Sequence, residues 1–367
     1  MNKSITVTIL LLVFTLSMLK PTLVYPQPQA LAYVDKGKVV LENDVIKVYF
    51  KPDEGAKIVR WIVKTLANVT PITESRYPYE WIPTGTWPGE IFSANFTYQI
   101  VKESGDEAVV EFKVNLATDA PGLEFTKIVT IKAGEHYWIN ITYILDNKGT
   151  AALKIQNPPA WGRKAGFMIE IGAKIGRNDT NDIQIWKFVG QDPIITKESW
   201  VVYPLDKTPT DTEWIGLFDN STDANMVDNA TYGLFIGLKL LDPSEGCFIW
   251  LEAAAGWTSI RTELKPLTLE PGQAKIYKTI WYCGPIWKEY LEEAGFNGVF
   301  EAIKPSNLPE EPPGEKKVEE KPKEIIPPTA LPLQLTWSNI VWIVVGILAA
   351  VGFIFLKIKA RKARSTS

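Results

Sequence analysis

The side chains that most often carry enzyme chemistry are scarce in this chain of 367 residues, which has one histidine, His136, and two cysteines. One histidine cannot supply a multi-histidine metal site, and two cysteines cannot form a four-cysteine zinc site. No GxxxxGKS/T or GxGxxG stretch is present, so nucleotide-binding functions have no support. His136 lies in a predicted strand between Glu135 and Tyr137, which favours a hydrogen-bonded structural histidine. We expect no metal and no cofactor.

The two cysteines, Cys247 and Cys283, both lie late in the chain. In an oxidising compartment they could form a disulfide, which is worth about 3–4 kcal/mol for a loop of this length. The alternative is two separate buried thiols. No CxxC pair is present, so redox catalysis is not expected.

Carboxylates are abundant, with 42 Asp and Glu residues. Paired-carboxylate glycosidase chemistry is therefore open, but nothing in the sequence singles out a pair, and we assign no catalytic residue. The acidic segment 219–228 could offer oxygen ligands to calcium. It lacks the spacing, the glycine and the terminal glutamate of an EF-hand, so we interpret it as a polar surface loop.

Aromatic side chains form the best local candidate for a binding site. Segment 77–87 is rich in turns and carries Tyr77, Tyr79, Trp81 and Trp87. Exposed aromatic rings on loops can stack on sugars or anchor a protein partner. The alternative is that these rings plug one end of the fold. Segment 158–163, which contains a tryptophan and an arginine, is a shorter version of the same pattern.

Short apolar or alternating runs separated by turn signals predict an antiparallel β domain. The fold class expected is an all-β supersandwich of large antiparallel sheets with a short C-terminal helix at 286–294, plus one transmembrane helix. The expected strands are 38–41, 45–50, 56–63, 98–102, 108–114, 125–131, 137–145, 183–188, 213–218, 232–240, 247–252 and 275–281.

Two apolar runs suggest the topology. Residues 1–32 read as a signal peptide cleaved before Tyr33, or as an uncleaved anchor. Residues 335–356 are uncharged and long enough to span a membrane, and the basic tail 357–367 places the C-terminus in the cytoplasm. Residues 33–304 are then the extracytoplasmic domain of a single-pass cell-membrane protein, anchored in lipid by its C-terminal helix. The Pro/Glu/Lys-rich linker 305–334 would hold this domain up to roughly 90 Å from the membrane.

The predicted outer domain carries glycosylation motifs, which agree with this location, and a net negative charge, which bears on its partners. Residues 33–304 have a net charge of −8. The whole chain has a net charge of only −3, because the segments at its two ends are basic. An acidic domain does not attract phosphate backbones, so we expect no nucleic-acid partner. Six N-glycosylation sequons all fall in this domain, at Asn68, Asn95, Asn140, Asn178, Asn220 and Asn229.

A family resemblance is carried by short segments at 40–48, 54–58, 134–141, 146–149, 214–218, 269–273 and 281–285. These segments are similar to the large periplasmic domain of the YidC membrane insertase family. Together they span about 260 residues and include a strand, a Gly-Pro pair and a helix at the C-terminal end. The resemblance implies a β-supersandwich, a fold shared with galactose mutarotase-like proteins. It does not imply insertase activity, because the five-helix membrane core of that family has no counterpart here.

By this resemblance we expect a non-catalytic binding domain that assists membrane protein insertion or export by holding client or translocon proteins. The alternative is a cell-surface protein that binds or processes carbohydrate, with glycans as partners, or a structural envelope glycoprotein. The two classes predict different surfaces. An exposed aromatic cleft with nearby carboxylates favours carbohydrate, whereas a broad apolar groove favours protein clients.

Overall fold

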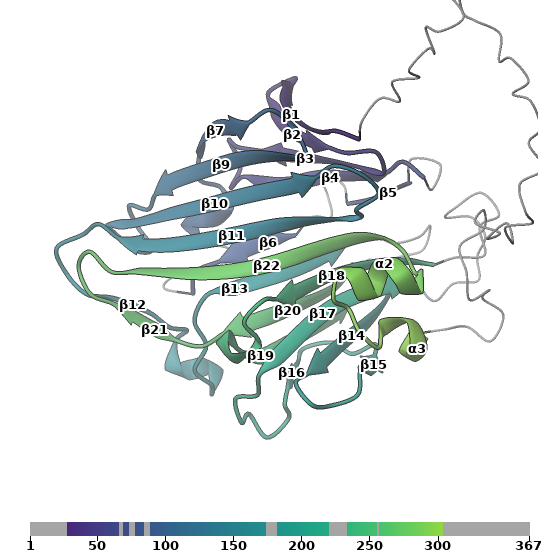
Figure 1. Cartoon of the computed structure of the whole chain (residues 1–367). Coiled ribbons are helices and arrows are strands. Elements are labelled where there is room, and N and C mark those ends of the chain that lie inside the picture. The colour runs from purple at the N-terminus through teal and green to yellow at the C-terminus, as the bar shows by residue number, and fades with distance from the viewer. Residues whose placement is uncertain are drawn as a thin grey trace, which may run out of the picture. The chain divides into compact units, whose positions relative to one another are not determined.

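The computed structural model describes residues 28–65, 69–72, 78–83, 89–173, 182–219, 233–254 and 257–303 (Figure 1). The chain divides into two units, Met1–Pro312 and Pro313–Ser367, and every described residue belongs to the first. Among these residues no helix is long and apolar enough to cross a membrane. The predicted membrane span, linker and cytoplasmic tail lie outside the described residues, as do residues 1–27 of the predicted signal.

A nine-stranded antiparallel sheet forms one layer of the domain, in the order β15-β14-β17-β18-β22-β11-β10-β9-β7. Its long central strands alternate buried and partly exposed side chains, as expected for a sheet with one face in the core. The expected antiparallel β architecture is thereby confirmed. The strands are β7 (Thr97–Lys102), β9 (Glu107–Asn115), β10 (Leu123–Lys132), β11 (Trp138–Asn147), β14 (Asp182–Phe188), β15 (Ile194–Thr196), β17 (Thr212–Asp219), β18 (Leu234–Leu240) and β22 (Ala274–Pro285).

Two further sheets are built from the N-terminal hairpins and from a short strand pair. The first is six-stranded, in the order β5-β4-β3-β2-β1-β8, and the second pairs β12 with β21. The predicted cleavage point before Tyr33 lies inside β1, whose first residues pair with β2 and β8. The strands are β1 (Ala30–Asp35), β2 (Lys38–Glu42), β3 (Ile46–Lys51), β4 (Lys57–Val63), β5 (Val69–Ile72), β8 (Ser104–Gly105), β12 (Leu153–Ile155) and β21 (Leu267–Leu269).

The fourth sheet is five-stranded and antiparallel, in the order β16-β19-β20-β13-β6. One face supplies Ile169, Ile171 and Ile260, among others, to the main hydrophobic core. Because side chains alternate along a strand, the residues between them project from the opposite face. The strands are β6 (Tyr79–Trp81), β13 (Met168–Ala173), β16 (Val201–Tyr203), β19 (Gly246–Ala254) and β20 (Trp257–Leu264).

A buried polar cluster joins the five-stranded sheet to the nine-stranded sheet. Glu80 of β6 accepts hydrogen bonds from Lys127 Nζ at 2.6 Å and from Tyr143 Oη at 3.0 Å. Lys127 also donates to the carbonyl of Ala56 in the six-stranded layer. A buried charge is tolerated when it is paired and hydrogen-bonded, so this cluster fixes the inward orientation of Glu80. Its neighbours on β6, Tyr79 and Trp81, therefore point to the other face.

Two short helices follow β22, α2 (Lys288–Glu293) and α3 (Val299–Ile303), which confirms the expected helix near residues 286–294. Gly295, with φ of 85°, follows the C-terminal end of α2. Phe296, between the helices, packs on the rings of Trp214 and Phe235. These contacts attach the C-terminal segment to the nine-stranded sheet.

Candidate functional site

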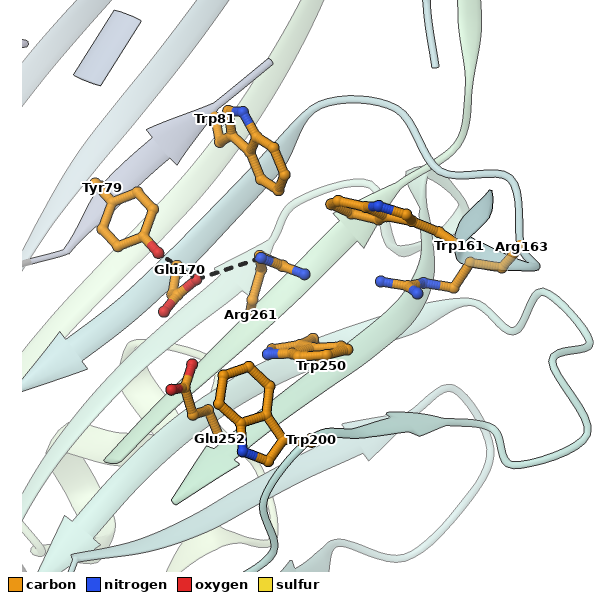
Figure 2. Close-up of a pocket in the computed structure, with 9 residues that line it drawn as sticks. All are labelled: Tyr79, Trp81, Trp161, Arg163, Glu170, Trp200, Trp250, Glu252 and Arg261. Atoms are coloured by element: carbon orange, nitrogen blue, oxygen red, sulfur yellow. Dashed lines mark hydrogen bonds and ion pairs between the residues drawn. The ribbon is translucent and has the colours of Figure 1, made fainter. Parts of the chain in front are cut away.

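A cavity of about 520 Å³ opens on the face of the five-stranded sheet that is turned away from the main core (Figure 2). Its lining consists of aromatic and charged side chains, with no aliphatic residue. The lining residues are Tyr79, Trp81, Trp161, Arg163, Glu170, Trp200, Trp250, Glu252 and Arg261.

Strand register explains why four of these side chains meet. Glu170 of β13 is paired with Tyr79 of β6 on one side and with Arg261 of β20 on the other. Arg261 is in turn paired with Trp250 of β19. Directly opposite residues project from the same face of a sheet, so the four side chains form a row across four strands. Glu252, two residues beyond Trp250 on β19, lies on that same face.

The loop that supplies Trp161 and Arg163 is closed at its base by Asn157. The amide N–H of Asn157 donates to the carbonyl of Ala165, and the Ala165 N–H donates to Asn157 Oδ1 at 2.7 Å. The loop contains the 3₁₀ turn η2 (Pro159–Trp161), which ends at Gly162 in the left-handed conformation. This closed loop therefore holds Trp161 and Arg163 over the sheet.

Arg163, Glu263 and Arg261 form a buried charge cluster beside the cavity. Arg163 binds the Glu263 carboxylate with two hydrogen bonds, one of them from Nε at 2.6 Å, and Arg261 Nη2 donates to the same carboxylate at 2.9 Å. Burial alone would raise the pKa of Glu263. The hydrogen bond from Arg163 and the two guanidinium charges instead hold that pKa below its usual value. The cluster is rigid, because Arg binds a carboxylate in a fixed planar geometry.

Glu170 and Glu252 differ in their surroundings. Glu170 Oε2 accepts from Tyr79 Oη at 2.7 Å and lies 3.5 Å from Arg261 Nη1. The side chain of Glu252 has no hydrogen bond or ion pair with any described residue. Partial burial, and then the negative charge of Glu170, raise the pKa of Glu252, while Arg261 opposes the shift.

Four indoles, together with the Tyr79 ring, form the aromatic part of the cavity wall. The ring centroids of Trp81 and Trp161 are 5.1 Å apart. Those of Trp200 and Trp250 are 5.8 Å apart, with an interplanar angle of 77°. Three of these rings surround the Arg261 guanidinium, with centroid distances of 5.2 Å to Trp250, 5.5 Å to Trp81 and 6.0 Å to Trp161. Such contacts hold both the cation and the rings in place.

Trp200 differs from the other three indoles in exposure and backbone conformation. The residue is 65% exposed, and its φ of 64° lies in the left-handed region, which is unusual for a bulky residue. The backbone N–H of Trp200 donates to the carbonyl of Leu251 at 2.9 Å, which fixes the residue to β19. Strained conformations persist where the surroundings enforce them, and they concentrate at functional positions. Trp200 thus forms an exposed aromatic wall at the mouth of the cavity.

A small apolar cluster, separate from the main core, lies next to the cavity. It contains Trp81, Ala165, Met168, Cys247 and Phe248. Met168 and Phe248 belong to β13 and β19, so the cluster packs on the same sheet face as the pocket residues. Trp81 therefore packs within this cluster, together with its other four residues.

Of the four aromatic residues predicted as a binding loop, Tyr79 and Trp81 line this cavity. Both lie on strand β6 and are nearly fully buried, so they are walls and not exposed loop residues. Tyr77 and Trp87 lie outside the described residues. The second aromatic segment also contributes, through Trp161 and Arg163.

The sequence did not indicate Glu170, Trp200, Trp250, Glu252 or Arg261. One signal was present: the segments 168–173 and 246–254 interleave Glu or Trp with residues that supply the core. A charged residue at alternate positions of an otherwise apolar strand marks the second face of that strand. Which charged residues come together depends on strand pairing, and pairing cannot be read from one sequence.

His136, Asn95 and Asn140 are not among the residues that line the cavity. His136 Nδ1 is 3.5 Å from Glu293 Oε1, and its ring contacts Trp138 at 4.6 Å. Within the described ranges no group of His, Cys, Asp or Glu could hold a metal ion. Asn95 is exposed and Asn140 is half-buried within β11. The sequons at Asn68, Asn178, Asn220 and Asn229, and the acidic segment beyond residue 219, lie outside the described residues.

Cys247 and Cys283 do not form a disulfide in the structure, and both thiols are free and buried. Cys247 belongs to β19 of the five-stranded sheet and Cys283 to β22 of the nine-stranded sheet. The Cys247 thiol instead donates to the carbonyl of Glu263 at 3.1 Å. The structure thus corrects the disulfide and agrees with the alternative of two buried thiols.

No family model matches the chain, and no curated protein sequence matches it. Among solved structures, a galactose mutarotase-like protein from Clostridium acetobutylicum is 11% identical and has a TM-score of 0.45, with 71% of this chain and 99% of that chain covered. A galactose mutarotase-like protein from Lactobacillus casei is 12% identical, with a TM-score of 0.42 and coverages of 67% and 100%. A TPR-domain containing protein from Parabacteroides distasonis is 15% identical, with a TM-score of 0.43. The match covers 67% of this chain and about half, 47%, of that protein.

Proposed function

We propose that the chain binds a saccharide in the cavity on the five-stranded sheet. The observation that carries this proposal is the corner between Trp200 and Trp250, whose ring centroids are 5.8 Å apart and whose planes are close to perpendicular, in a cavity that the Glu252 side chain also lines (Figure 2). A pyranose ring has an apolar C–H face and a rim of hydroxyl groups. An indole offers its face to the first, and a carboxylate or guanidinium accepts or donates hydrogen bonds to the second.

The composition of the cavity wall supports a ligand of this mixed character. Of the nine lining residues, five are aromatic and four are charged. An apolar ligand would leave the Glu252 carboxylate, which has no hydrogen bond or ion pair with any described residue, without a partner in a partly buried site, which costs free energy. A small ion would use none of the indole surface. The cavity volume of about 520 Å³ also falls in the range typical of small-ligand sites.

The same wall gives no support to the insertion-assisting role that the sequence resemblance implied. A site for apolar protein clients needs a broad apolar groove, and this cavity is lined by two arginines and two glutamates. We assign binding and no reaction to the pocket.

We also propose, from the predicted signal, sequons and membrane span, that the pocket faces the outside of the cell. A membrane-impermeant amine reagent applied to intact cells is expected to label the domain. Protection of the domain until the membrane is broken would contradict this location.

The experiment that tests saccharide binding is a glycan array probed with the full-length protein in mild detergent. We expect the wild type and a Leu205→Ala control to bind the same set of glycans, and Trp200→Ala to lose that signal. Leu205 lies just after β16, whereas Trp200 lies just before it; Leu205 is similarly exposed, at 69%, but does not line the cavity. Binding of no glycan, or equal binding by Trp200→Ala, would overturn the proposal.

A further inference from the structure

The charges around the cavity do not balance. Glu170, Glu252 and Glu263 supply three carboxylates, whereas Arg163 and Arg261 supply two guanidinium groups. Glu263 is fully engaged by both arginines, and Glu170 is paired with Arg261. When Glu252 is ionised, the site therefore carries one negative charge that no described residue neutralises.

That charge belongs to a side chain that is only partly buried. The Glu252 side chain is half-buried and has no partner among the described residues. It lines the cavity together with Trp200, whose backbone N–H bonds the carbonyl of Leu251, the residue before Glu252 (Figure 2). Of the charged groups that act on it, Glu170 on β13 disfavours its ionised form and Arg261 on β20 favours it. A cation bound next to Glu252 would relieve this repulsion.

The indole of Trp200 offers a face on which such a cation can bind. The rings of Trp81, Trp161 and Trp250 already contact guanidinium groups within the protein. The described part of the chain places no cation over Trp200. An ammonium group over an indole face and beside a carboxylate gains both a cation–π contact and a charge-assisted hydrogen bond.

Anionic saccharides fit the site poorly. A phosphate or a uronate would need a free guanidinium, but Arg163 and Arg261 both already bind the Glu263 carboxylate, and Arg261 also faces Glu170. Such a ligand would also be repelled by Glu252. Charge complementarity thus selects against an anion and in favour of a cation.

We infer that the saccharide bound by this pocket carries a protonated amino group, which lies against the Trp200 indole and pairs with the Glu252 carboxylate. This inference rests on the proposed saccharide-binding function and names its substrate class. A hexosamine combines the apolar ring face, the hydroxyl rim and the cation in one molecule.

The test is calorimetric titration of the full-length protein with matched monosaccharides at neutral pH. Three stereochemical series are used, gluco, galacto and manno, each with a hydroxyl, an N-acetylamino and a free amino group at C2. In at least one series we expect the free amino sugar to bind at least tenfold more tightly than the other two members. We expect Glu252→Gln to remove that difference, and Glu270→Gln, which removes an exposed charge outside the cavity, to preserve it.

The outcomes separate this inference from the function on which it rests. If neutral sugars bind as well as amino sugars in every series, or if Glu252→Gln retains the preference, the inference is wrong and the saccharide site stands. If neither these sugars nor any glycan on the array binds, both are wrong. A preference for the amino sugar that persists in Trp200→Ala would remove the indole from the proposal.

Discussion

Arg261 and Trp250 are directly paired across strands β20 and β19, with the guanidinium 5.2 Å from the indole centroid. The same guanidinium binds the carboxylates of Glu263 and Glu170. The Trp250 ring is therefore held by Arg261, which is itself held by the Glu263 and Glu170 carboxylates. An aromatic surface held in this way loses little conformational entropy when a ligand stacks on it, which favours binding.

The first prediction concerns the aromatic character of position 200. Trp200→Phe should keep most of the saccharide affinity, whereas Trp200→Ala should lose at least tenfold, because stacking needs a flat apolar face. Both variants should unfold within about 0.5 kcal/mol of the wild type, since the side chain is mostly exposed. Calorimetric titration and urea unfolding measure the two quantities. Equal affinity of the Phe and Ala variants would contradict the stacking role.

The second prediction concerns the buried charge cluster. Glu263→Gln should lower the free energy of unfolding by about 3–5 kcal/mol, because it leaves the charges of Arg163 and Arg261 buried with less compensation. Urea denaturation of both proteins at neutral pH is the measurement. The control is Asp211→Asn, which breaks the exposed ion pair with Lys265 and should cost about 0–1 kcal/mol. Similar losses in the two variants would show that the cluster is not the fixed support described above.

The third prediction concerns acid stability. The pKa of Glu263 is lower in the folded protein than its ordinary value of 4.5, so its contribution to stability is complete above about pH 4.5. It is lost as the pH falls through the lowered folded value. The free energy of unfolding, measured in urea from pH 7 down to pH 3, should fall more steeply in the wild type than in Glu263→Gln. Parallel curves would mean that Glu263 does not titrate with a lowered pKa.

The fourth prediction concerns the cysteines. Burial raises the pKa of the Cys247 and Cys283 thiols, so neither is expected to react with a thiol reagent in the folded protein. After denaturation without reductant, a thiol count of two per chain is expected. A count of zero would show that the cysteines are oxidised in a disulfide, contrary to the structure.

The sequence predicted the nine-stranded sheet far better than the sheet that carries the site. Every strand of the larger sheet except β15 coincides with an expected strand. Several of these strands, β9 among them, have one face in the core and the other partly exposed, which produces a regular alternation of apolar and polar residues. β10 (Leu123–Lys132) and β11 (Trp138–Asn147) show this pattern clearly.

In the five-stranded sheet only β19 was expected. Its strands place residues such as Glu170, Arg261 and Glu263 at buried positions, which interrupts the apolar pattern on which prediction depends. The buried charged residues that make these strands hard to predict from sequence also form the pocket and the charge cluster beside it. Sequence rules fail in this way at functional sites, where burial of polar groups is compensated by partners far along the chain. Arg163 and Glu263, a hundred residues apart, are one such pair.

The measurement that tests the central claim most directly is fluorine NMR of the full-length protein labelled with fluorotryptophan, titrated with a saccharide that binds on the array. Signals of Trp200 and Trp250 are assigned from the Trp200→Ala and Trp250→Ala variants. We predict that saccharide shifts these two signals and leaves those of the core residues Trp186 and Trp214 in place. Saturable binding with no change at Trp200 and Trp250 would contradict the account, because the ligand would then lie elsewhere on the protein.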